Sequence, residues 1–204
     1  MVLDHTQPLS EDDASADPFE QFGRWYAQAA AAVRVPEAVA LATVGGDGRP
    51  SLRMVLCKRW DDAGFVFHTN YGSRKAGELA GRPHAALLFH WDELGRQVRI
   101  EGGAERLSGE ESDSYFATRP FGAQVGAWAS RQSKVVASRA VLDEQIAAVA
   151  GEYAGHPVPR PEWWGGYRIR PDAFEFWQNR DDRLHDRLAY RQEAVGWVME
   201  RLQP

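Results

Sequence analysis

Short apolar segments separated by turn residues dominate the middle and the end of the chain. Residues 38–44 are apolar and run into Gly45-Gly46-Asp47-Gly48, a pattern typical of a hairpin. The predicted strands are 38–44, 52–58, 65–70, 85–91, 97–107, 167–177, 184–191 and 197–202. Since tight turns link most of them, we expect a mostly antiparallel β-barrel with peripheral helices packed outside.

Helical patterns interrupt this series. Asp17 and Pro18 form a helix start, and apolar residues follow at helical spacing to Val33. Further helices are predicted at 73–80 and 108–118, each opened by a serine that can cap it, and at 138–153, where apolar residues share one face. Residues 1–16 are acidic, small and polar, and we expect a disordered tail before a single domain at 17–204.

Composition narrows the function. The 204 residues carry a net charge of −5, which argues against a chain-wide nucleic-acid surface. Cys57 is the sole cysteine, so an intramolecular disulfide and cysteine-rich metal sites are excluded. The sequence has no H-E-x-x-H motif, so we expect no metal. It also has no G-x-G-x-x-G, P-loop or G-x-S-x-G motif, so neither a Rossmann-type or P-loop nucleotide site nor a nucleophilic hydrolase is indicated. Without a signal-peptide pattern or a long apolar run, we expect a cytoplasmic protein that binds no membrane.

Two segments offer cations to an anion. Arg53 and Lys58 frame an apolar strand, and their odd spacing puts them on opposite faces unless a bulge intervenes. Taken alone, these two residues fit solvated strand ends better than a ligand site. Residues 69–75 join a strand end to a capped helix that carries Arg74 and Lys75. Such a helix start can cradle a phosphate, although a basic helix start at the surface explains this segment equally well.

Polar groups elsewhere admit two interpretations each. Gln97 and Arg99 share the polar face of a predicted strand, where an amide could bond a heterocycle or simply face solvent. Gln132 and Ser133 precede a predicted helix and could cap it or bind a ligand.

The most unusual local pattern is the alternation of Arg183, His185 and Arg187. A regular strand would place these three side chains on one face. A row of like charges is costly unless an anion or carboxylates compensate it. We therefore expect either a bound anion or a set of cross-strand salt bridges.

Several segments together resemble the pyridoxamine 5′-phosphate oxidases. The resemblance rests on Phe176-Trp177-Gln178 followed by Arg183-Leu184-His185-Asp186-Arg187. It extends to Trp164-Gly165-Gly166-Tyr167-Arg168, Gly126-Ala127-Trp128-Ala129-Ser130, Asp17-Pro18 and the terminal Glu200-Arg201-Leu202-Gln203-Pro204. It implies a homodimer of FMN-binding split β-barrels, with two FMN sites across the subunit interface.

The resemblance also implies site residues. The implied FMN contacts are Arg53, Met54, Val55, Leu56, Cys57, Lys58, His68, Thr69, Arg74, Lys75, Gln97, Gln132, Ser133, Trp177 and Arg187. The implied substrate contacts are Lys58, Tyr115, Arg119, Ala123, Arg183 and His185, of which Arg183 and His185 would be catalytic. Tyr115 and Arg119 are four residues apart, so a helix would place both on one face.

Three positions depart from the family pattern. His68 stands where an aromatic residue is usual, Ala123 where many members have a phosphate-binding serine, and Phe121 where an arginine is common. The implied activity is FMN-dependent oxidation of pyridoxine or pyridoxamine 5′-phosphate by O2, giving pyridoxal 5′-phosphate and H2O2. The alternatives are a phenazine-pathway flavin oxidase and a non-catalytic protein that binds FMN or pyridoxal phosphate.

Overall fold

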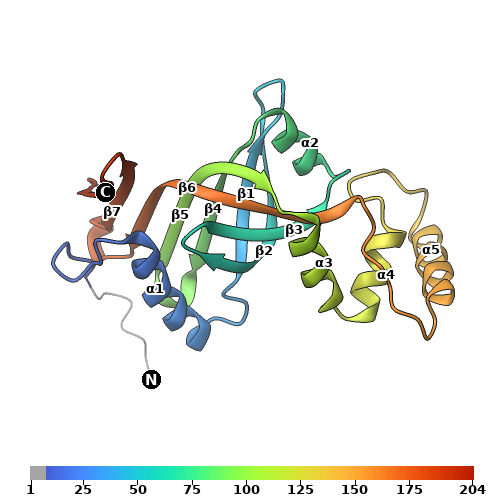
Figure 1. Ribbon diagram of the computed structural model, residues 1–204. Coiled ribbons are helices and arrows are strands. Elements are labelled where there is room, and N and C mark those ends of the chain that lie inside the picture. The colour runs from blue at the N-terminus through green and yellow to red at the C-terminus, as the bar shows by residue number, and fades with distance from the viewer. Residues whose placement is uncertain (1–7) are drawn as a thin grey trace.

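A computed structural model describes residues 8–204, and within them eight strands form one antiparallel sheet. The strand order is β3-β2-β1-β4-β5-β6-β7-β8, and an additional pairing of β3 with β6 closes the first six strands into a barrel. The strands are β1 Ala38–Val44, β2 Pro50–Asp61, β3 Gly64–Asn70, β4 His84–Trp91, β5 Arg96–Arg106, β6 Trp164–Gln178, β7 Asp186–Glu193 and β8 Gly196–Arg201. The predicted antiparallel barrel with peripheral helices is confirmed (Figure 1).

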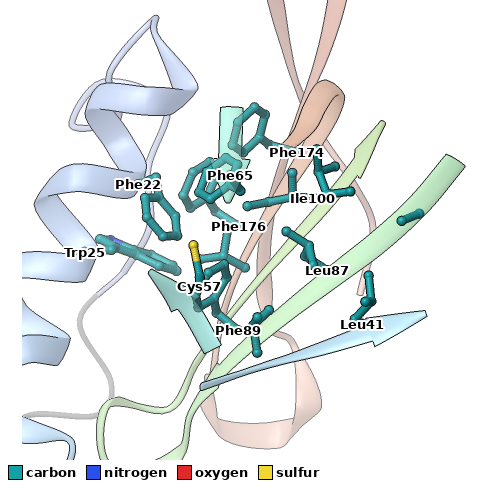
Figure 2. Close-up of a cluster of buried hydrophobic side chains, with 14 of the residues drawn as sticks. Phe22, Trp25, Leu41, Cys57, Phe65, Leu87, Phe89, Ile100, Phe174 and Phe176 are labelled. Atoms are coloured by element: carbon teal, nitrogen blue, oxygen red, sulfur yellow. The ribbon is translucent and has the colours of Figure 1, made fainter. Parts of the chain in front are cut away.

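Aromatic and aliphatic side chains fill the barrel. Alternation along β1 buries Val39, Leu41 and Thr43, and the other strands add mainly phenylalanine and leucine. Helix α1, Pro18–Ala32, begins at the Asp17 cap and covers one barrel opening with Phe22 and Trp25. Figure 2 shows these two rings facing the phenylalanines of the strands. The barrel is therefore a packed core, and a ligand must bind outside it.

Four further helices lie outside the strands. They are α2 Arg74–Gly81, α3 Gly109–Ala117, α4 Phe121–Ala129 and α5 Arg139–Glu152. Ser73 and Ser108 cap α2 and α3 as predicted, and Ser138 caps α5, because each serine oxygen accepts a backbone N–H of the first turn. The sequence reading missed α4, which follows Pro120 instead of a polar cap residue. Helices α3, α4 and α5 gather at one end of the barrel, opposite α1 and β7 (Figure 1).

Two predictions at the chain ends need correction. Residues 8–16, expected to be disordered, pack against the C-terminal hairpin, where Leu9 is buried and Tyr190 Oη donates to Ser15 O at 2.8 Å. Residues 1–7 of the predicted tail lie outside the described residues. The strand expected at 184–191 is present but begins and ends two residues later, at Asp186–Glu193, after a short 3-10 turn, η2, at Asp181–Arg183.

Strand β6 is long enough to serve two regions of the molecule. Its first residues pair with β3, with Trp164 opposite Asn70. Its last residues pair with β7, with Trp177 opposite Arg187. The 13 steps between the two tryptophans correspond to about 40 Å of strand at roughly 3.3 Å per residue.

Candidate active site

A cavity of about 820 Å³ opens beside the barrel, between β2, β3, the start of α2, and the ends of α3 and α4 that face it. Its lining includes most of the residues implied by the resemblance: Arg53, Met54, Val55, Leu56, Lys58, His68, Thr69, Arg74, Lys75, Tyr115, Arg119, Ala123, Gln132 and Ser133. Small-molecule sites commonly enclose roughly 300–1,000 Å³, so the cavity has the size of a ligand site.

Lys75 organises the polar end of this cavity. Its buried ammonium donates to Thr69 Oγ1 at 3.1 Å and to Gln132 Oε1 at 2.9 Å. Burial lowers the pKa of Lys75, and nearby Arg53 lowers it further. These contacts join β3, α2 and the 130–133 segment, where Ser133 adopts a positive φ of 69°. Gln132 and Ser133 therefore close the cavity beside the start of α2. A helix start is a favourable place for an anion.

A buried carboxylate holds the two arginines beside Lys75. Glu78 lies on α2, with its side chain 8% exposed, and accepts from Arg74 Nε at 2.8 Å and from Arg53 Nη2 at 3.2 Å. Burial acts to raise the pKa of Glu78. Hydrogen bonds from Ser51, Thr43, Arg74 and Arg53 outweigh it, however, and lower the pKa to about 2. Glu78 is therefore ionised and fixes both guanidinium groups at the cavity wall.

Arg53 and Lys58 line the same cavity in spite of their odd spacing. The pairing of β2 with β3 shifts register between Cys57 and Arg59, so strict alternation ends at Lys58. The β-bulge that the sequence analysis allowed for is therefore present. Lys58 Nζ lies 3.3 Å from Glu37 Oε1.

Stacked rings form another wall of the cavity. His68 stacks on Tyr115 with ring centroids 3.9 Å apart, and on Trp164 at 5.3 Å. The guanidinium of Arg119 lies 4.5 Å from the Trp164 ring centroid. Burial, and then the charges of Arg119 and Arg59, lower the pKa of His68 to about 4, so its ring is neutral near pH 7.

Three buried polar atoms in this wall lack a hydrogen-bond partner within the described part of the chain. Both ring nitrogens of His68 and Nη1 of Arg119 have no hydrogen-bond partner among residues 8–204. An unpaired buried donor costs roughly 1–3 kcal/mol. Such atoms at a cavity wall are typical of a site completed by a ligand.

Cys57 lies apart from the other β2 residues implied by the resemblance. Cys57 does not line the cavity. Its side chain is buried in the barrel core (Figure 2). Burial raises the pKa of its thiol to about 12, so the thiol stays protonated. An unreactive structural cysteine fits these facts.

A second group of implied residues lies away from the cavity. Gln97, Trp177 and Arg187 stand opposite one another on β5, β6 and β7, so they form a single row across the sheet. His185 packs its ring 4.5 Å from that of Trp177. The backbone N–H of Arg180 donates to His185 Nδ1 at 3.2 Å.

The predicted row of cations is corrected by the backbone. Arg183 belongs to η2 and has a positive φ of 62°, and His185 precedes β7, so only Arg187 lies on the strand. Arg187 Nε donates to Glu175 Oε1 at 2.8 Å. The cross-strand salt bridge that was the alternative to a bound anion is therefore confirmed for Arg187.

Figure 1 places β7 and helices α3–α5 at opposite ends of the barrel, so the two groups of residues are well separated in one copy of the chain. Trp164 lines the cavity and Trp177 belongs to the second group, yet both lie on β6. One copy of the chain therefore cannot close both groups around the same small ligand.

Some lining residues were missed by the sequence reading. They are Ser51, Leu52, Thr118, Pro120 and Trp164. Trp164 was noted only as part of a motif, and its place in the ring stack required the pairing of β3 with β6. The even spacing of Ser51 and Arg53 on a predicted strand is the one signal that could have added Ser51.

Neither a membrane-spanning helix nor a side-chain cluster suited to a metal ion occurs among residues 8–204. None of their helices combines the length and apolar character needed to cross a membrane. They also contain no cluster of three or more histidine, cysteine, aspartate or glutamate side chains suited to a metal ion.

Family comparisons cover nearly the whole chain. Residues 26–152 match the family model described as pyridoxamine 5′-phosphate oxidase. Residues 164–204 match the model described as the pyridoxine 5′-phosphate oxidase C-terminal dimerisation region. The second match contains all of β6, β7 and β8, and therefore most of the second group of site residues.

Individual relatives agree with these matches. The chain is 57% identical to a pyridoxine/pyridoxamine 5′-phosphate oxidase of Rubrobacter xylanophilus, over 96% of this chain and 91% of the relative. It is also 57% identical to the protein of that name from Burkholderia cenocepacia, over 96% and 93%. Among solved structures, PhzG from Burkholderia lata in complex with tetrahydrophenazine-1-carboxylic acid is 36% identical, with a TM-score of 0.91 over 98% of this chain and 100% of that one.

Proposed function

The chain belongs to the pyridoxamine 5′-phosphate oxidase family, and from this we propose that it oxidises pyridoxine or pyridoxamine 5′-phosphate with bound FMN and O2. The products are pyridoxal 5′-phosphate and H2O2, with ammonia released from the amine substrate. The observation that carries the proposal is the cavity itself, where a cationic end adjoins a wall of stacked rings.

The cavity residues fit FMN. Its phosphate requires cations and N–H donors, which Arg74, Lys75 and the start of α2 supply. A flat ring system requires planar walls and polar atoms at its edge, and the wall formed by Tyr115, His68 and Trp164 has both. The chemistry that bound FMN would supply there is two-electron oxidation of the substrate, with O2 as the final electron acceptor.

The partner subunit completes the site in this proposal. A homodimer would bring Gln97, Trp177 and Arg187 of one copy to the cavity of the other, as the dimerisation-region match supports. Exposed apolar side chains beside the cavity fit such an interface: Leu52 is 69% exposed and Met54 64%.

The substrate phosphate fits the other end of the cavity. We assign it to Lys58, Tyr115 and Arg119, which all line the cavity, and the orphaned Nη1 of Arg119 would gain an acceptor. Ala123 also lines this region but offers only a methyl group. Two cations and a phenol suffice to hold a phosphate, so the departure at Ala123 weakens binding without removing the clamp.

Arg183 and His185 are assigned to the substrate face away from the flavin. Arg183 lies on an exposed turn, and His185 is held by Trp177. Their side chains would cover the substrate ring and orient the reacting carbon. The chain's own contribution is thus binding, orientation and charge.

The similarity to PhzG keeps a phenazine-pathway oxidation as a second candidate. The cations at Lys58 and Arg119 favour a phosphate ester over a carboxylic acid, because a phosphate dianion uses both.

One assay tests the two proposed oxidase activities. The purified protein is examined for a flavin spectrum and then incubated in air with pyridoxine 5′-phosphate. Formation of pyridoxal phosphate with an equal amount of H2O2 is the expected result. A protein that takes up no FMN contradicts both oxidase readings, and a yellow protein that leaves the substrate unchanged contradicts the proposed reaction.

A further inference from the structure

We propose that Asp186 is a positioning residue, which fixes the orientation and the tautomer of His185 by tying the Arg180–Asp186 turn to both ends of the chain. The inference rests on the proposed function for the role of His185, whereas the arrangement itself is a property of the chain. Asp186 stands between two implied site residues, yet the resemblance gave it no role.

Both oxygens of Asp186 are engaged. Oδ1 accepts from Arg201 Nη1 at 2.8 Å, and Oδ2 accepts from the backbone N–H of Leu9 at 3.1 Å. Arg180 Nε lies 3.7 Å from Oδ2, and the Asp186 side chain is only 18% exposed. One carboxylate thus joins the N-terminal segment, the last strand and the entrance of the turn.

The outer partners of Asp186 are themselves fixed. Arg201 also donates to Leu9 O at 2.8 Å and forms two hydrogen bonds to the carboxylate of Glu11, at 2.7 and 2.6 Å. The hydrogen bond from Arg201 lowers the pKa of Glu11 to about 2, so this pair stays charged. Asp186 is therefore anchored to a group that other contacts hold in place.

The turn that Asp186 closes needs such an anchor. Asp182 and Arg183 have positive φ values of 58° and 62°, a region that non-glycine residues rarely adopt. Strained backbone persists only where its surroundings hold it. The contacts that span this turn join Arg180 to His185 and to Asp186.

The same geometry sets the tautomer of His185. A backbone N–H can only donate, so Nδ1 of His185 must accept the hydrogen bond from Arg180. In the neutral ring the proton then sits on Nε2. His185 would therefore present an N–H donor to the substrate and act as an orienting group rather than as a base.

The test compares the full-length FMN-loaded parent with Asp186→Asn, which keeps the size but removes the charge. Asp143→Asn is the matched control, since Asp143 forms an ion pair on the exposed surface of α5. We expect Asp186→Asn to lower kcat by roughly tenfold to a hundredfold, as small misplacements of reacting groups do. FMN affinity should stay within about twofold, and Asp186→Glu should recover part of kcat.

A spectroscopic measurement separates positioning from general stability. Nitrogen-15 NMR of labelled histidine, with His185→Gln to assign the signal, should show the Nε2–H tautomer in the parent and a mixture in Asp186→Asn. An Nδ1–H tautomer in the parent, or an unchanged tautomer and kcat in Asp186→Asn, would overturn the proposal. A parent that binds FMN but forms no pyridoxal phosphate would instead defeat the proposed function, while the NMR comparison still decides the role of Asp186.

Discussion

A heterodimer built from two differently damaged copies should regain one working site. Arg119→Ala removes a cavity residue, and His185→Ala removes a residue of the second group. If each site combines the cavity of one copy with the second group of the other, one site of the heterodimer carries both defects. The opposite site carries neither.

The magnitude follows from the contacts and the symmetry. Arg119→Ala loses charge-assisted hydrogen bonds to the substrate phosphate, worth roughly 1.5–3 kcal/mol, so its homodimer should lose about 10- to 150-fold in kcat/KM. The heterodimer has one intact site of two and should retain about half of the parental kcat/KM. The strand between Trp164 and Trp177, about 40 Å long, excludes repair within one copy.

Coexpression with two different tags allows the heterodimer to be isolated, and peroxide release in air measures its turnover. Each variant homodimer and a doubly tagged parent serve as controls. Heterodimer activity no greater than the mean of the two homodimers would refute the two-copy site, because it would show that each copy completes its own.

Three further outcomes are expected. Lys75→Met should weaken FMN binding by roughly tenfold or more while leaving riboflavin binding unchanged, because the cation serves the phosphate; equal losses in fluorescence titrations would contradict this. Ala123→Ser should lower the KM for pyridoxine 5′-phosphate several-fold, and steady-state kinetics showing no fall would remove Ala123 from the clamp. Glu78 has a lowered pKa of about 2, so its stabilising charge is present above its ordinary pKa and is lost as pH falls toward that value. The stability difference between the parent and Glu78→Gln in urea titrations should therefore shrink from about pH 5 to pH 2; a constant difference would count against this assignment.

Local chemistry made much of the fold predictable. Alternation of apolar residues located the strands, and Asp17, Ser73 and Ser108 marked helix starts, because a cap acts within one turn. Helix α4 lacks such a signal and was missed. Arg183 was placed on a strand face with His185 and Arg187 because the positive φ values of the η2 turn fall on Asp182 and Arg183, with no glycine to mark them.

Much of the cavity lining was predictable as a set of residues but not as an arrangement. The resemblance supplied both groups, yet only the closure of the barrel brings Gln132 to Lys75, 57 positions apart in the chain. Glu78, which holds Arg53 and Arg74, attracted no attention because a lone glutamate on a short helix is usually a solvated side chain. Long-range pairing decides such contacts, and local patterns do not report it.

The reach of β6 has a consequence for how the protein would be loaded in the cell. Under the proposed arrangement the two ends of this strand belong to two different sites, so a lone copy offers FMN only part of its contacts. Cofactor capture and subunit association would then be thermodynamically linked, and each would raise the apparent affinity of the other. Dilution would release FMN, and an excess of FMN would hold the two copies together.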